Sequence, residues 1–126
     1  MDLEKVGKDC EFIQTLLREA FPNFLIQINV QRILGWTVRV MFANVPGKKA
    51  APYGILENAS FVGVALIQEN RDGTCYMDCP AHMTRNIKFR KISGKDHSTV
   101  LAKFHDWMIR NREAILAITP RYNTVG

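Results

Sequence analysis

Two cysteines and a histidine lie close together in the stretch RDGTCYMDCPAHMTRNIKFRKISGK, residues 71–95. Cys75, Cys79 and His82 have side chains that bind zinc, so they are the metal candidates of this chain. Their spacing argues against a shared ion. If residues 74–79 form a strand, the two cysteines share a face but stand about 13 Å apart, whereas both sulfurs must lie about 2.3 Å from one zinc. We therefore expect no metal site and no cofactor.

A thiol active site is a second interpretation of the same stretch. It requires a cysteine beside a base, and Cys79 could meet His82 or His97. Nothing in the local sequence marks a nucleophile, and small buried cysteines are the commoner case. We expect the core-facing side chains of this strand to be Cys75, Met77 and Cys79, with Tyr76 and Asp78 pointing outward.

Basic residues dominate the end of the stretch. Between residues 85 and 95 there are five of them and no acid: Arg85, Lys88, Arg90, Lys91 and Lys95. In a strand over residues 86–92, Ile87 and Phe89 would face the core, and Lys88 and Arg90 the other side. Such a face offers cations to phosphates. The alternative is a solvated edge strand, where lysine and arginine discourage aggregation.

Helices are expected at both ends of the chain. Apolar residues recur at three- and four-residue steps over residues 2–21, and Pro22 ends that segment: Leu3, Val6, Cys10, Ile13, Leu16, Leu17 and Ala20. A second helix is expected from Thr99 to about Ile118, capped by Asp96 or Ser98. Trp36 and Trp107 fall on apolar stripes, so we expect both in the core.

Strands are expected between the helices. Apolar and polar residues alternate over 24–31 and 36–42, which predicts a hairpin with one polar face: Gln27, Asn29, Gln31, Thr37 and Arg39. Residues 60–68 are apolar on both faces, which favours a central strand, and a turn with Asp72-Gly73 follows. Strands at about 74–79 and 86–92 complete the set. Residues 44–59 are expected to form a long loop.

These elements predict an α+β fold in one domain over residues 1–126, with 121–126 as a frayed tail. An antiparallel sheet of about five strands, in the order α-β-β-β-β-β-α, would carry both helices on one face. The other face would stay open to water or to a partner. Because unrelated families share this outline, it does not identify a function.

Composition narrows the class of protein. The chain has 126 residues, a hydrophobic fraction of 47% and a net charge of +5. We expect a cytoplasmic protein, because the charged first residues lack an apolar signal core, no apolar run could span a membrane, and three cysteines fit a reducing compartment. The positive charge favours an anionic partner.

The first hypothesis is a small non-enzymatic binding protein whose open sheet face engages nucleic acid or a nucleoprotein complex. Its candidate contact residues are Arg39, Lys48, Lys49, Tyr76, Lys88, Arg90 and Lys91. The alternative is a protein–protein interaction module, such as a self-assembling subunit or an inhibitor from a phage or other mobile element. A cysteine- or zinc-dependent enzyme is the third hypothesis. The sequence does not identify the partner or the oligomeric state.

Overall fold

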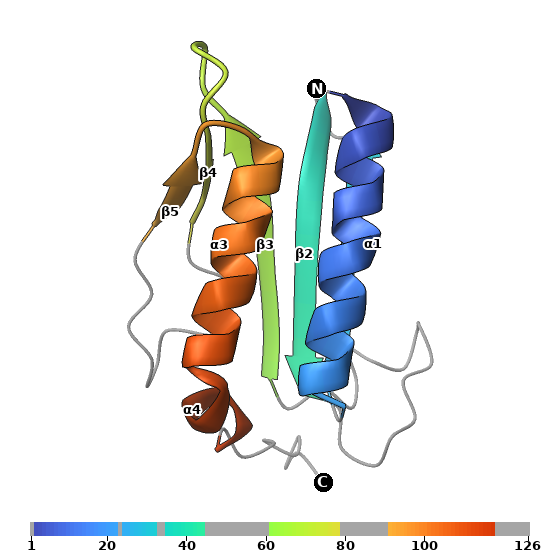
Figure 1. The fold of residues 1–126 in the computed structure, drawn as a ribbon, viewed down its shortest axis with the longest axis vertical. Helices are drawn as coiled ribbons and strands as arrows, with labels where there is room; N and C mark the ends of the chain where they lie inside the picture. The colour runs from blue at the N-terminus through green and yellow to red at the C-terminus, as the bar shows by residue number, and fades with distance from the viewer. Residues whose placement is uncertain (1, 23, 33–34, 45–60, 79–90, 118–126) are drawn as a thin grey trace, which may run out of the picture.

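The fold was analysed in a computed structural model of the chain, which describes residues 2–22, 24–32, 35–44, 61–78 and 91–117. The elements follow one another as α1 (Leu3–Ala20), β1 (Phe24–Arg32), β2 (Trp36–Asn44), β3 (Phe61–Glu69), β4 (Cys75–Met77), β5 (Ile92–Gly94), α3 (His97–Arg110) and α4 (Arg112–Leu116) (Figure 1). The described helices thus stand before and after the strands, as the sequence predicts.

The five strands form one antiparallel sheet in the order β1-β2-β3-β4-β5, so each strand pairs with its neighbour in sequence. β3 is the middle strand, which confirms the central position predicted from its apolar residues. The β3–β4 connection is the predicted tight turn: Gly73 has a positive φ of 88°, and its amide donates to the Asn70 carbonyl at 3.1 Å. β1 and β5 are the two edges of the sheet.

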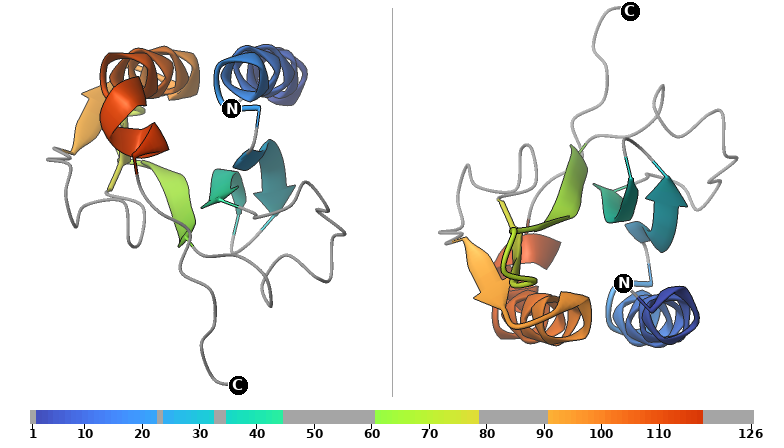
Figure 2. Two further views of the ribbon diagram at one scale, coloured as in Figure 1. Left: turned by 90° about the horizontal axis from the view of Figure 1, so that it is seen from below. Right: turned by 90° about the horizontal axis from the view of Figure 1, so that it is seen from above.

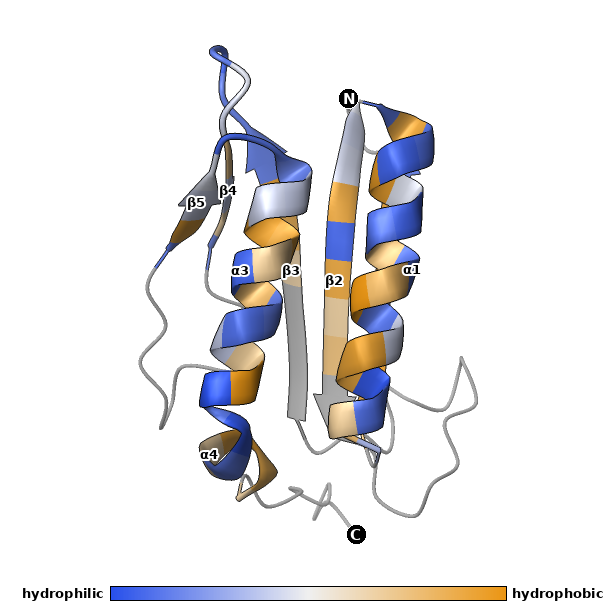
Figure 3. Cartoon of the chain, in the orientation of Figure 1, coloured by the Kyte–Doolittle hydropathy of each residue, from blue (hydrophilic) through white to orange (hydrophobic). Residues whose placement is uncertain are grey.

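Helices α1 and α3 lie side by side on one face of the sheet (Figure 2). The core lies between this pair and the strands, and its fully buried side chains include Leu17, Ile26, Phe42, Ile67 and Phe104. Hydrophilic and hydrophobic residues alternate in bands along both helices, as expected when one side of a helix is buried (Figure 3). The predicted α+β fold is therefore confirmed.

The predicted stripe of α1 is correct except at its ends. Val6, Cys10, Ile13 and Leu17 are buried, while Leu3 is 39% exposed. Asp2 caps the helix by accepting a hydrogen bond from the Lys5 amide at 3.2 Å. None of the helices in the described segments is long and apolar enough to cross a membrane.

The strands after the turn differ from the prediction. β4 covers only Cys75–Met77, and β5 covers Ile92–Gly94, so it begins at the last residue of the strand predicted over about 86–92. Ile92 is buried and Lys91 is exposed. The alternation predicted for residues 86–92 would have placed Ile92 outward, so its phase does not hold at β5.

The predicted C-terminal helix is two helices. Asp96 caps α3 by accepting from the Thr99 amide at 2.8 Å, in agreement with one of the two predicted caps. α3 ends at Arg110 because Asn111 leaves the helical conformation, and its side-chain amide donates to the Trp107 carbonyl at 2.8 Å. This competition by the asparagine side chain divides the single helix predicted from the sequence.

The two tryptophans have different environments. Trp107 is buried, as predicted, but Trp36 is 49% exposed, so its core assignment is wrong. Trp36 opens β2 opposite Arg32, at the end of the sheet beside the first turn of α1. The Arg32 guanidinium carbon lies 5.8 Å from the centre of its ring. An apolar stripe that reaches a strand end does not require burial of its last residue.

Candidate nucleic-acid interface

The face of the sheet opposite the helices carries the polar side chains predicted for it. The hairpin alternates so that Ile26, Ile28, Val38 and Val40 are buried on the helix side. The residues between them, Gln27, Asn29, Gln31, Thr37, Arg39 and Met41, are half-buried on the other side. We call this second side the open face. Leu66 of β3 also has this orientation, so the open face is polar with apolar patches.

Arg39 and Asn29 face each other across β1 and β2. The Arg39 Nε and the Asn29 Oδ1 are both closed to solvent, and neither has a hydrogen-bond partner among the described residues. A donor and an acceptor left unpaired in this way cost free energy. Arg39 and Asn29 are therefore polar residues of the open face whose hydrogen bonding is incomplete within the described segments.

Tyr76 and Lys91, two of the residues predicted for the interface, are in contact. The Lys91 Nζ lies 4.0 Å from the centre of the Tyr76 ring, a cation–π interaction. Tyr76 is half-buried, and its hydroxyl donates to the Gln68 Oε1 at 2.9 Å. Its neighbours Cys75 and Met77 are buried on the helix side, so the ring lies on the open face, as predicted.

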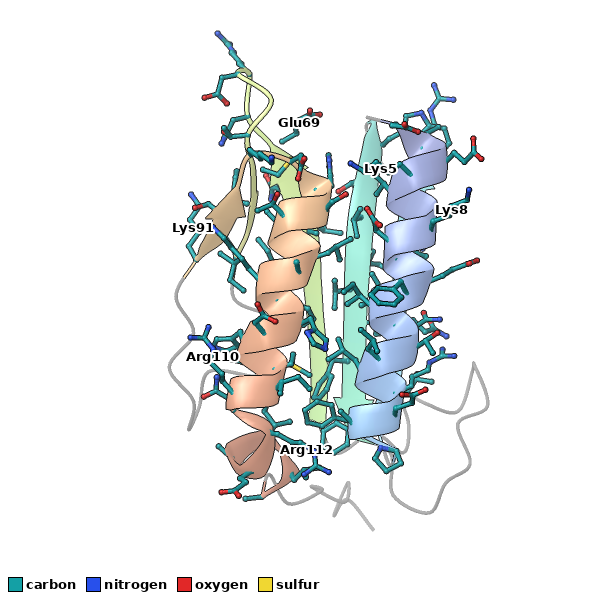
Figure 4. The ribbon with its side chains drawn as sticks, viewed as in Figure 1. Lys5, Lys8, Glu69, Lys91, Arg110 and Arg112 are labelled. Atoms are coloured by element: carbon teal, nitrogen blue, oxygen red, sulfur yellow. The ribbon has the colours of Figure 1, made fainter. Side chains whose placement is uncertain are left out.

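A cleft of about 920 Å³ lies between β5 and α3, and Lys91 forms part of its wall. Lys103 and Arg110 line it from α3, together with Asp106. The Lys103 Nζ donates to the Ser93 carbonyl at 2.7 Å. Lys91 and Arg110 lie on the same side of the molecule, along the β5–α3 edge (Figure 4). Neither α3 cation was among the predicted contact residues, because their seven-residue spacing places them on one side of a helix as in any solvated helix face.

Several predicted residues lie outside the part of the chain that the structure describes. These are Lys48, Lys49, Cys79, His82, Lys88 and Arg90. The interface and metal assignments made for them stay predictions.

The one metal candidate within the described segments, Cys75, contacts His97. The Cys75 Sγ lies 3.4 Å from the His97 Nδ1, and both side chains are buried. Burial raises the pKa of the Cys75 thiol to about 11, and burial lowers the pKa of His97. A nucleophile needs the opposite shift in its thiol. Within the described segments, no three histidine, cysteine or acidic side chains are grouped as metal ligands.

Comparisons of the chain with protein-family models, with curated proteins and with solved structures found no match.

Proposed function

We propose that this protein is a non-enzymatic binding protein whose open face and β5 edge engage single-stranded nucleic acid. The observation that carries the proposal is the position of Lys91, which touches the Tyr76 ring on the open face and also lines the cleft with Lys103 and Arg110. An aromatic ring for base stacking and three cations for phosphates are thereby adjacent, and these are the components of sequence-tolerant strand binding.

Arg39 extends this surface across the sheet. In the strand register Arg39 pairs with Leu66. Continuing the β3–β4 and β4–β5 registers by one residue past Met77 and Ile92 would place Leu66 opposite Asp78, and Asp78 opposite Lys91. Arg39 and Lys91 thus stand in one row, roughly 14 Å apart at about 4.8 Å per strand. A bound strand would run along this row, with a base on Tyr76. Lys48, Lys49, Lys88 and Arg90 remain part of the proposal from sequence.

Binding requires the Tyr76 ring to exchange partners. In the free protein the Lys91 ammonium contacts the face of the Tyr76 ring. A stacked base would displace it, and the released ammonium would pair with a phosphate. Base stacking contributes about 1–3 kcal/mol per base, compared with about 0.5–1 kcal/mol for an exposed cation–π contact, so the exchange is favourable.

Fluorescence anisotropy with a labelled single-stranded oligonucleotide, as DNA and as RNA, tests the proposal. Binding should weaken steeply between about 50 mM and about 200 mM salt. The reason is that binding releases cations condensed on the nucleic acid, and this release becomes less favourable as the salt concentration rises. Each of Lys91→Met and Arg110→Met should lower affinity and reduce the slope of log K against log salt by about 0.7. Tyr76→Leu should lower affinity without changing the slope.

Lys8→Met is the matched control, because it also removes one positive charge. Lys8 lies on α1, on the opposite side of the molecule from Lys91 (Figure 4). It should leave affinity unchanged. Asp78→Asn provides a gain-of-function arm: Asp78 is exposed within the cationic row, and removal of its charge should strengthen binding. If Lys8→Met and Lys91→Met lower the affinity equally, the effect is one of net charge, and the proposed binding surface is wrong.

A further inference from the structure

The outer edge of β1 is covered along only half of its length. Ile26 and Ile28 direct their backbone groups away from β2, as alternate residues do at the edge of an antiparallel sheet. The Ile26 carbonyl accepts from Arg18 Nε at 2.9 Å, and the Ile28 amide donates to Gln14 Oε1 at 2.9 Å. Side chains from the second half of α1 therefore occupy this part of the edge.

The remaining half of the edge is not covered by any described residue. By the same alternation, the Ile28 carbonyl and both backbone groups of Val30 point outward. Within the described residues no hydrogen-bond partner meets these outward groups. The helix stripe that supplies Gln14 and Arg18 continues toward the N-terminus as Glu11, Gly7 and Leu3. Gly7 has no side chain, and no atom lies within 4 Å of where its Cβ would be.

An apolar groove adjoins this open edge. Leu3, Gly7 and Cys10 of α1 line one wall, and Val30 and Trp36 of the hairpin line the other. Trp36 is 49% exposed and Leu3 is 39% exposed. Unpaired strand edges of this kind pair readily with another strand unless they are blocked.

From this geometry we infer that the β1 edge binds a second copy of the chain, through antiparallel pairing of β1 with β1 across a twofold axis at Val30. The free window runs from Ile28 to Arg32 and is symmetric about Val30. Pairing there forms two reciprocal hydrogen bonds between the Val30 residues. It also places the amide of Arg32 opposite the Ile28 carbonyl of the other copy, twice.

Charge favours a second copy as the occupant. The chain carries a net charge of +5, so two copies repel each other in most orientations. In the proposed register Arg32 of one copy stands opposite Ile28 of the other. Glu11, which lines the groove with Ile28, is then within reach of that guanidinium, and symmetry repeats the pair. Opposite charges that meet twice across a twofold axis select for self-association.

Sedimentation velocity across a concentration series, without nucleic acid, tests the inference independently of the proposed function. We expect a monomer–dimer equilibrium. Val30→Pro removes the outward N–H, a change that an edge strand tolerates, and should weaken dimerisation at least about tenfold. Trp36→Ser tests the groove in case the proline variant does not fold. Phe12→Ser is the control, because Phe12 is 63% exposed on α1 and does not line the groove.

Hydrogen exchange provides the second readout. The Val30 amide should exchange more slowly at concentrations where the dimer dominates, because the dimer forms its hydrogen bond. Slower amide exchange that is confined to β1 and α1 supports the inference. A protein that is monomeric at about 200 µM, a concentration at which even weak dimers form, overturns it. A dimer that Val30→Pro and Trp36→Ser leave intact also overturns it.

Discussion

The thiol of Cys75 lies 3.4 Å from Nδ1 of His97, where the first turn of α3 meets β4. The two side chains are 1% and 4% exposed, and the His97 Nε2 is buried with no hydrogen-bond partner in the described part of the chain. This contact between a cysteine and a histidine resembles the pair of a thiol enzyme in composition only. Burial favours the neutral form of both groups, so the contact serves the packing of the core.

Cys10 and Cys75 should not react with thiol reagents in the folded protein. Burial raises the pKa of each thiol to about 11, and each side chain is closed to solvent. Labelling with a chromogenic disulfide at neutral pH, in a Cys79→Ser background, should therefore occur only at the rate of unfolding. Rapid labelling of Cys75 in the native state would restore the thiol-enzyme hypothesis.

His97 should make the protein less stable as the pH falls. Burial lowers its pKa, an effect that Glu69 and Asp96 oppose and the N-terminal amino group reinforces. The unfolded chain therefore binds the proton first, below about pH 6.5, and the unfolding free energy declines from there toward the folded pKa.

Melting temperatures between pH 7.5 and pH 5 test this expectation. His97→Met should flatten the dependence in this window, although it also lowers stability at neutral pH because the packing with Cys75 changes. His105→Gln is the control, because it removes an imidazole from the same helix and keeps the buried contact of His97 with Cys75. A slope that His97→Met leaves unchanged would assign the titration to another group.

The sequence predicts this fold well wherever one period extends over many residues. Ile26, Ile28, Val38 and Val40 alternate strictly, so the hairpin, its buried face and its polar face follow from the pattern. The central place of β3 follows equally from its apolar run. The pairing register, which sets the neighbours of Arg39, was not predicted, because alternation fixes only the face on which each residue lies.

The errors occur where tertiary contacts decide. Ile92 is buried because β5 pairs with β4 and packs under α3, a contact that no short-range pattern encodes. Asn111 interrupts a pattern that continues on both sides of it. Two contacts join residues far apart in sequence: Tyr76 with Lys91, and Cys75 with His97. The spacing of the cleft residues Lys103 and Arg110 does not distinguish them from an ordinary solvated helix face.

The start of α3 should contribute measurably to stability. Asp96 accepts hydrogen bonds from both the amide and the hydroxyl of Thr99, and Ser98 donates to the Asp9 carboxylate of α1. Asp96→Ala should cost about 1 kcal/mol as the loss of a helix cap, which lowers the melting temperature by roughly 4 °C. Urea denaturation provides the free energy. An Asp2→Ala variant, which removes the cap of α1, is the comparison.

The same cap adds an acid sensitivity separate from that of His97. Hydrogen bonds from the Thr99 side chain and amide lower the pKa of Asp96. A carboxylate with a lowered folded pKa stabilises the protein above its unfolded value, near pH 4, and that stabilisation is lost as the pH falls through the folded pKa. Asp96→Asn should remove this second acid transition. Because the Asp96 charge opposes the lowering of the His97 pKa, the variant should also keep or steepen the slope between pH 7.5 and pH 5.

Arg39 should show a conflict between binding and stability. Its Nε is a buried donor to which the described segments offer no acceptor, so Arg39→Met keeps the apolar stem and removes an unsatisfied group. We expect the unfolding free energy to stay the same or to rise by up to about 1 kcal/mol, whereas oligonucleotide affinity falls. Lys8→Met loses only a surface ion pair with Glu4 and should lower stability by about 0.3–0.5 kcal/mol with affinity unchanged. If Arg39→Met lowers both stability and affinity, the guanidinium stabilises the sheet. Arg39 would then not be assigned to nucleic-acid binding at the centre of the open face.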